Sequence, residues 1–223
     1  MKLSKRVLGH TLFTFTFVTL VYYVIKSDIK FLNGELWGIT TKSWLFLALI
    51  VPIMHQFYVF VCWYLQLNYK SITKSFGNEF GFKLYKIGFA ILILLRPVTI
   101  LILAFSNAHT FVLNSTFKYF ISGILFIPSA YLFYSVKKYF GMNKAFGIDH
   151  FEPEKFRNET FVKKGIFKYT SNGMYIYGFM ALYIPGLLLL SKAAIFAALL
   201  NHLYIWVHYY FTELPDIKKI YKN

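Results

Sequence analysis

Two apolar runs near the C-terminus decide how this chain is organised: MYIYGFMALYIPGLLLL (residues 174–190) and KAAIFAALLNHLYIWVHYYF (residues 192–211). A helix needs about 20 mostly apolar residues to cross a bilayer. The two runs are separated only by the Ser191-Lys192 step, so they predict a tight helical hairpin in a membrane. Pro185-Gly186 interrupts the first run, which indicates that this arm dips or tilts instead of crossing fully.

Four more apolar runs precede the hairpin. They predict spanning helices at Val7–Ile25, Ser43–Leu67, Leu84–Ser106 and Phe117–Val136. The first is interpreted as a retained span, because it is long for a signal peptide and no small-residue cleavage site follows it. The sequence therefore predicts an all-α integral membrane protein with five to six transmembrane helices. We divide it into a four-helix membrane bundle (1–136) and a C-terminal core (137–223).

Composition supports this class and excludes others. Of the 223 residues, 57% are hydrophobic and only 15% are charged, whereas soluble domains carry about 25% charged residues. The net charge of +15 fits loops that lie against anionic lipid better than nucleic-acid binding, for which no motif is present. Membrane lipids are the expected surroundings, and the sequence does not predict an oligomeric state.

The distribution of positive charge predicts the orientation. With a cytoplasmic N-terminus and six spans, 18 of the 24 Lys and Arg residues fall in the N-terminal segment, two loops and the tail on that side. Positively charged loops are retained in the cytoplasm. We therefore expect a multi-pass protein with both termini cytoplasmic, and with the 136–175 loop on the same side as the C-terminal tail.

Polar residues in the last apolar run indicate a pocket. His202, Trp206, Tyr209 and Glu213 recur at helical spacing and should share one face, and His208 belongs to a neighbouring polar stripe. Hydrogen bonding between helices is the alternative explanation. His202 and His208 lie on nearly opposite sides of a helix, and no metal-ligand motif occurs, so no metal is predicted.

One charged residue lies within a predicted span. Arg96, directly before Pro97, is costly at membrane depth. It either binds an anionic group of a substrate, or satisfies carbonyl groups that the proline leaves free.

The C-terminal third resembles the membrane methyltransferases that include isoprenylcysteine carboxyl methyltransferase and phosphatidylethanolamine N-methyltransferase. The resemblance covers about 60 residues, with the phospholipid branch closest at the Thr212–Tyr221 end. It departs from the family pattern at Ser171, Gly173 and Thr212. Through the first element of the pattern the chain reads Gly165, Phe167, Tyr169, Asn172, Gly173, Met174, Tyr175 and Gly178.

The resemblance implies methyl transfer from S-adenosylmethionine in a cytoplasmic cofactor pocket. Glu213 would accept a hydrogen bond from the α-ammonium of the cofactor, and Asn172 and His208 would bind its carboxylate or ribose. Aromatic faces attract cations, so the tyrosines would line the adenine and sulfonium groups. The residues expected to bind the cofactor are Tyr169, Asn172, Gly173, Tyr175, His208, Tyr209 and Glu213.

The resemblance also implies residues that would act on the methyl acceptor. Candidate bases for an amine acceptor are His202, His150 and Asp149, and Arg96 would hold a phosphate or carboxylate of the acceptor. The expected acceptor is a lipid or lipophilic molecule, with a phospholipid amine headgroup favoured. The alternatives are a carboxyl methyltransferase of the isoprenylcysteine type, and a non-catalytic membrane scaffold or transporter subunit.

Overall fold

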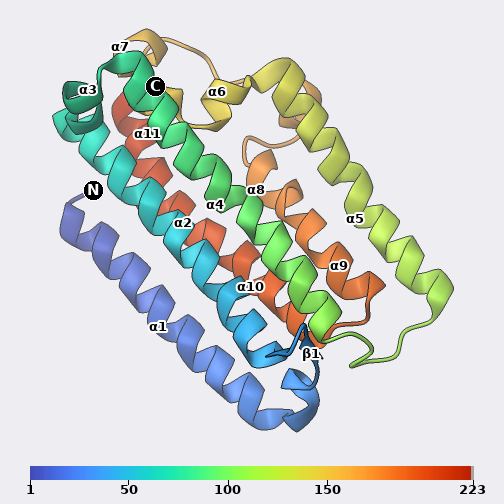
Figure 1. Ribbon diagram of the computed structural model, residues 1–223. Helices are drawn as coiled ribbons and strands as arrows, with labels where there is room; N and C mark the ends of the chain where they lie inside the picture. The colour runs from blue at the N-terminus through green and yellow to red at the C-terminus, as the bar shows by residue number, and fades with distance from the viewer. Residues whose placement is uncertain (222–223) are drawn as a thin grey trace.

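The computed structural model describes residues 1–221 as a bundle of slanted helices, with several short helices at one end and a two-stranded hairpin at the other (Figure 1). The long helices are α1 (Leu3–Ser27), α2 (Thr41–Tyr69), α4 (Asn78–Ser106), α5 (Ser115–Ser135) and α10 (Lys192–His208). Shorter α-helices are α3 (Ser71–Phe76), α6 (Met142–Ala145), α7 (Pro153–Phe156), α8 (Gly173–Tyr177), α9 (Tyr183–Leu188) and α11 (Leu214–Ile220).

The remaining elements are small. The 3₁₀ turns are η1 (Ile29–Leu32), η3 (Ile148–His150), η4 (Gly165–Lys168) and η5 (Phe179–Leu182), and the π-helical turns are η2 (Val136–Phe140) and η6 (Tyr209–Glu213). Strands β1 (Glu35–Leu36) and β2 (Ile39–Thr40) pair antiparallel, with Glu35 opposite Thr40.

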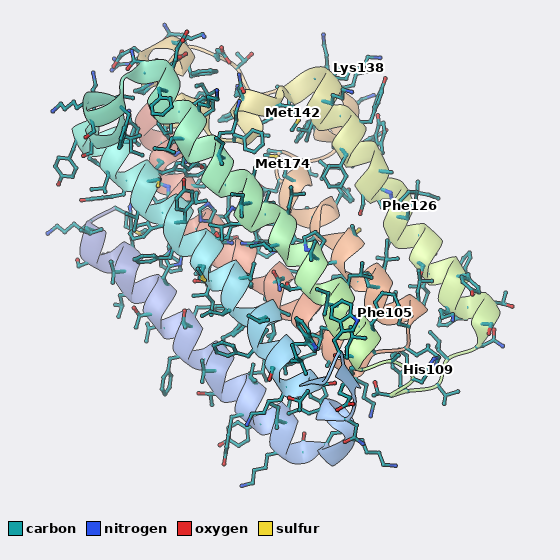
Figure 2. All side chains as sticks on the ribbon, in the orientation of Figure 1. Phe105, His109, Phe126, Lys138, Met142 and Met174 are labelled. Atoms are coloured by element: carbon teal, nitrogen blue, oxygen red, sulfur yellow. The ribbon has the colours of Figure 1, made fainter. Side chains whose placement is uncertain are left out.

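Within residues 1–221, four helices combine the length and hydropathy of a membrane span: α1, α2, α4, and α5 continued through η2. Their outer faces carry large exposed apolar side chains such as Phe105 on α4 and Phe126 on α5 (Figure 2). Such a surface is unusual in a soluble monomer and suits lipid. The four runs are therefore confirmed as helices that are long and apolar enough to cross a membrane.

The hairpin is confirmed at its turn, but its first arm is not one long helix. Ser191 ends the turn and caps α10 by accepting a hydrogen bond from the Ala194 N–H at 3.1 Å. The first arm instead consists of α8, η5 and α9, together an apolar stretch from Gly173 to Leu188. A helix of that length spans about 24 Å, short of the ~30 Å hydrocarbon core. The six-span count therefore remains a prediction.

Small residues allow α10 to lie in the centre of the bundle. Ala193, Ala194, Ala197 and Ala198 are fully buried, and α10 packs against α1, α2, α4 and α9. Small residues let helix backbones approach closely in membranes. The C-terminal hairpin and the first helices thus pack together. The division of the chain into two parts at residue 136 remains a prediction.

One buried side chain fixes the register of α10 at the end of the bundle that carries β1. Asn107 donates to the carbonyl groups of Phe31 and Asn33, at 3.1 and 2.8 Å. Its Oδ1 accepts hydrogen bonds from the Ser191 hydroxyl and the Ala193 N–H, both at 3.0 Å. This amide joins the ends of α4 and η1 to the start of α10, and so determines which residues of α10 reach the other end.

Candidate functional site

A cavity of about 600 Å³ lies at the end of the bundle that carries α6, α7 and α11. It is enclosed by the 140–175 loop region, α8, η6 and α11, and α2 contributes one wall. Its lining residues are Trp63, Phe140, Lys144, Ala145, Gly147, Asp149, His150, Phe161, Ser171, Asn172, Met174, Tyr175, Tyr209, Glu213, Leu214, Ile217, Lys218 and Tyr221. Met174, labelled in Figure 2, belongs to this wall.

One wall of the cavity is formed where the helical pitch changes after α10. After His208 the chain widens into the π-helical turn η6 and continues as α11, with Pro215 in its first turn. Tyr209 and Glu213 line the cavity from this turn, and Tyr209 packs on Tyr175 of α8 with ring centroids 5.6 Å apart. π-Helical turns are rare and are often found at functional sites.

The floor of the cavity is a buried ionic cluster. Nδ1 of His150 lies 3.0 Å from Oδ1 of Asp149, and Nε2 of the same ring lies 3.5 Å from Oδ2 of Asp216. The other oxygen of Asp216 forms a 2.7 Å ion pair with Arg6 of α1. The Tyr221 hydroxyl donates to Oδ2 of Asp149 at 3.0 Å. Residues from both ends of the chain therefore meet in one cluster around the two aspartates that flank His150.

The charges in this cluster stabilise one another. Burial by itself would lower the pKa of His150, but Asp149 and Asp216 raise it to about 9. Burial opposes ionisation of both aspartates, yet His150 lowers their pKa values below the ordinary value, with Tyr221 helping at Asp149 and Arg6 at Asp216. At neutral pH the cluster thus contains a charged imidazolium between two carboxylates.

Glu213 lies beside this cluster without a partner of its own. Its Oε2 is shielded from solvent and makes no hydrogen bond within the described part of the chain. Burial raises the pKa of Glu213 to about 8, with further contributions from Asp149 and Asp216. A buried carboxyl oxygen that lacks a donor and lines a cavity is suited to accept a cationic ligand group.

Trp63 of α2 forms the side wall above the histidine. Its ring is stacked on His150 with centroids 3.8 Å apart and planes inclined by 19°. Gly147, at φ +82°, allows this packing, because a Cβ at that position would collide with the Trp63 ring. The turn that begins at Gly147 therefore holds the imidazole against the indole.

The structure brings six of the predicted site residues to the cavity: Asp149, His150, Asn172, Tyr175, Tyr209 and Glu213. Ser171, one of the departures from the family pattern, also lines it. Gly173 is buried next to Asn172, where a Cβ would come within 3.3 Å of Ile166. His208 is buried close to Trp63, with ring centroids 5.4 Å apart.

Three predicted residues lie away from the cavity wall. His202 contacts the Tyr183 hydroxyl at 3.3 Å and stacks on Phe179. It lies eleven residues before Glu213, about 16 Å along a helix, which is too deep to share its wall. Tyr169 is 74% exposed. Arg96 is buried in the bundle, where its Nη2 lies 3.4 Å from the Pro52 carbonyl oxygen and its guanidinium faces the Phe179 ring.

Sequence reasoning missed Arg6, Trp63, Lys144 and Tyr221 as parts of this site. Arg6, Trp63 and Tyr221 contact residues more than 60 positions away, which helical periodicity cannot reveal, and Lys144 pairs with Glu159 in the same loop region. A weak signal was available for Tyr221, because the resemblance extended to it without giving it a role. Among residues 1–221, no group of three or more His, Cys, Asp or Glu side chains is arranged to hold a metal ion.

Comparison with known proteins gives one match. Residues 117–223 match the family described as phospholipid methyltransferase. No curated protein and no solved structure matches the chain. The matched residues contribute every wall of the cavity except Trp63 of α2.

Proposed function

We propose, from the premise that residues 117–223 belong to the phospholipid methyltransferase family, that this protein transfers a methyl group from S-adenosylmethionine to a lipid or lipophilic acceptor. The favoured acceptor is the amine headgroup of a phospholipid. The observation that carries the proposal is the unpartnered, buried Oε2 of Glu213 in an aromatic-lined cavity of about 600 Å³.

The lining residues fit the chemistry of this cofactor, which would supply an electrophilic methyl group on a sulfonium. Glu213 offers an acceptor for the α-ammonium group, and charge-assisted hydrogen bonds of this kind are strong. Asn172 offers both a donor and an acceptor for the carboxylate or the ribose. The Tyr175 and Tyr209 rings present faces that attract a sulfonium cation. Lys218 and Lys144, the latter paired with Glu159, also line the cavity and would add positive charge for a carboxylate.

Positioning is the main contribution that we assign to the protein, because methyl transfer is a displacement at an already activated carbon. An amine acceptor must also lose a proton. His150 carries its own proton at neutral pH between two aspartates, so we assign it the role of orienting Asp149. We propose that Asp149, which lines the cavity and is ionised, receives the proton of the amine.

Cofactor binding is the direct test. Titration calorimetry of the full-length protein in detergent should detect S-adenosylmethionine binding, and Glu213→Gln should abolish it. Glu152→Gln is the matched control, since Glu152 pairs with Lys155 on the same end of the molecule and does not line the cavity. An unresponsive wild-type protein would overturn the proposal. If the wild-type protein binds the cofactor, incubation with a lipid extract and labelled cofactor would identify the acceptor.

The effect of Asp149 distinguishes the two acceptor chemistries. A carboxylate acceptor, as in an isoprenylcysteine-type enzyme, releases no proton and needs no base. Asp149→Asn should therefore depress amine methylation much more than cofactor affinity. Equal rates for Asp149→Asn and the wild type would favour a carboxylate acceptor.

We further propose that the protein crosses the membrane several times, with both termini and the cavity on the cytoplasmic side. The charge distribution along the sequence supports this orientation. Single cysteines placed at Ser171 and Lys218, which line the same cavity, should react with an impermeant reagent from the cytoplasmic side only. Labelling of the two positions from opposite sides would exclude a shared site.

A further inference from the structure

A second cavity, of about 450 Å³, lies on the other side of α11, between the start of α1 and the end of α2. It shares Lys218 with the first cavity, and α11 forms the partition between them. The lining side chains that matter here are Lys2, Arg6, Tyr64, Asn68, Lys218 and Lys219.

The wall of this basic cavity is strongly positive. Four of its lining residues are Lys or Arg, and none of the described lining residues is Asp or Glu. Lys219 is held in place by donating to Oδ1 of Asn68 at 2.7 Å. Like charges gathered around one space repel each other, and an anion in that space would relieve the repulsion.

Arg6 makes this more than a cluster of surface lysines. Only 4% of Arg6 is exposed, and its Nη2 is engaged by Asp216. Its Nε and Nη1 are shielded from solvent and have no hydrogen-bond partner within residues 1–221. The planar guanidinium fork matches the oxygens of phosphate and carboxylate groups, and buried donors of this kind need an acceptor.

The first turn of α1 points to the same kind of ligand. Lys2 and Leu3 line the cavity, no side chain caps the N-terminus of this 25-residue helix, and no acidic residue occurs in its first turn. The first N–H groups of a helix lack intrahelical partners and attract anions. The start of α1 and the Arg6 side chain thus line the same space.

We propose that the basic cavity binds a phosphate group, supplied either by the headgroup of an anionic lipid or by free phosphate. Arg6 and the N–H groups of the α1 N-terminus would contact its oxygens, and Lys2, Lys218 and Lys219 would supply further charge. The site is separate from the methyl-transfer cavity, and its existence does not depend on whether the chain transfers a methyl group.

The test compares full-length protein in phosphatidylcholine nanodiscs under three conditions at constant ionic strength: added chloride, added inorganic phosphate, and phosphatidic acid in the bilayer. The readout is the thermal midpoint, together with native mass spectrometry of retained lipid. The variant is Lys2→Gln/Lys219→Gln, in which both altered side chains are exposed. The control Lys137→Gln/Lys163→Gln removes the same charge from exposed positions outside both cavities.

We expect phosphate or phosphatidic acid, but not chloride, to raise the midpoint of the wild type and the control. Binding to the cavity variant should be roughly tenfold weaker or more, since two of the basic side chains that would neutralise the phosphate charge are removed. Stabilisation only by phosphatidic acid identifies a lipid headgroup, and stabilisation by inorganic phosphate identifies the free ion. Equal responses of variant and control, or an equal effect of chloride, would overturn the proposal.

Discussion

Arg6 and His150 bind opposite oxygens of one carboxylate, that of Asp216, so the first helix of the chain is tied to the floor of the candidate site through the last one. The Arg6 pair measures 2.7 Å and the His150 contact 3.5 Å, and the Asp216 side chain is fully buried. The matched family segment begins at residue 117. Arg6 therefore supports the site from outside that segment.

Asp216→Asn should destabilise the protein strongly. It keeps the shape of the side chain but leaves two buried cations short of a counter-charge, and breaking a buried pair in this way costs about 3–5 kcal/mol. Thermal unfolding in detergent measures the effect. Glu154→Gln is the control, because it breaks an exposed pair with Arg157 and should cost no more than about 0.5 kcal/mol. Similar midpoints for the two variants would mean that the cluster contributes little to stability.

Stability should decline at alkaline pH because of His150. Its pKa is about 9 in the folded protein against an ordinary value of 6.5. The resulting stabilisation is fully present below pH 6.5 and is lost as the pH rises through 9. His150→Gln should lower the midpoint at pH 7 and flatten its dependence between pH 7 and 9.5. If the thermal midpoint of the variant depends on pH as steeply as that of the wild type, other groups cause the loss of stability at alkaline pH.

Glu213→Gln should stabilise the ligand-free protein at pH 8 while removing cofactor binding. The folded carboxyl, with a pKa of about 8, keeps a proton that the unfolded chain releases near pH 4.5, so stability falls as the pH rises from 4.5 to 8. The neutral amide abolishes this loss. We expect a thermal midpoint a few degrees higher at pH 8 and no difference at pH 4.5. A lower midpoint at pH 8 would show that the ionised carboxylate has a stabilising partner.

Arg96→Met separates the two explanations of the buried arginine. If Arg96 holds an anionic group of the acceptor, the variant should raise the KM for the acceptor about tenfold or more, with the Kd for S-adenosylmethionine unchanged. If Arg96 only satisfies the Pro52 carbonyl group, the kinetic constants should stay the same and the thermal midpoint should change instead. Steady-state kinetics combined with calorimetry decides between these outcomes.

Much of the fold follows from the sequence because long apolar runs leave few alternatives. The four runs that precede the hairpin form long helices whose limits lie within six residues of the predicted ones, and the Ser191-Lys192 turn lies where expected. The expected interruption of the 174–190 run is present: α8 ends with Gly178 as its C-cap, and Pro185, in the first turn of α9, has no N–H to continue the preceding helix. Hydropathy measures how apolar such a run is, and does not register these interruptions.

The candidate site was only partly predictable for a related reason. Helical spacing placed His202 and Glu213 on one face, but it does not weigh depth, and the π-helical turn at Tyr209–Glu213 changes the pitch just before the site. Tyr209 and Glu213 reach the cavity, whereas His202 lies deep against Tyr183. The partners of His150 come from residues 63, 216 and 149, and only the last is a neighbour in sequence.

The tie between Arg6 and Asp216 also has a consequence for biosynthesis. Helix α1 leaves the ribosome before α11, so some two hundred residues are synthesised between Arg6 and its partner Asp216. Until then Arg6 and His150 both lack the carboxylate of Asp216. A chain arrested before α11 would contain every long helix and would still lack this carboxylate, so the candidate site can be completed only after α11 has been synthesised.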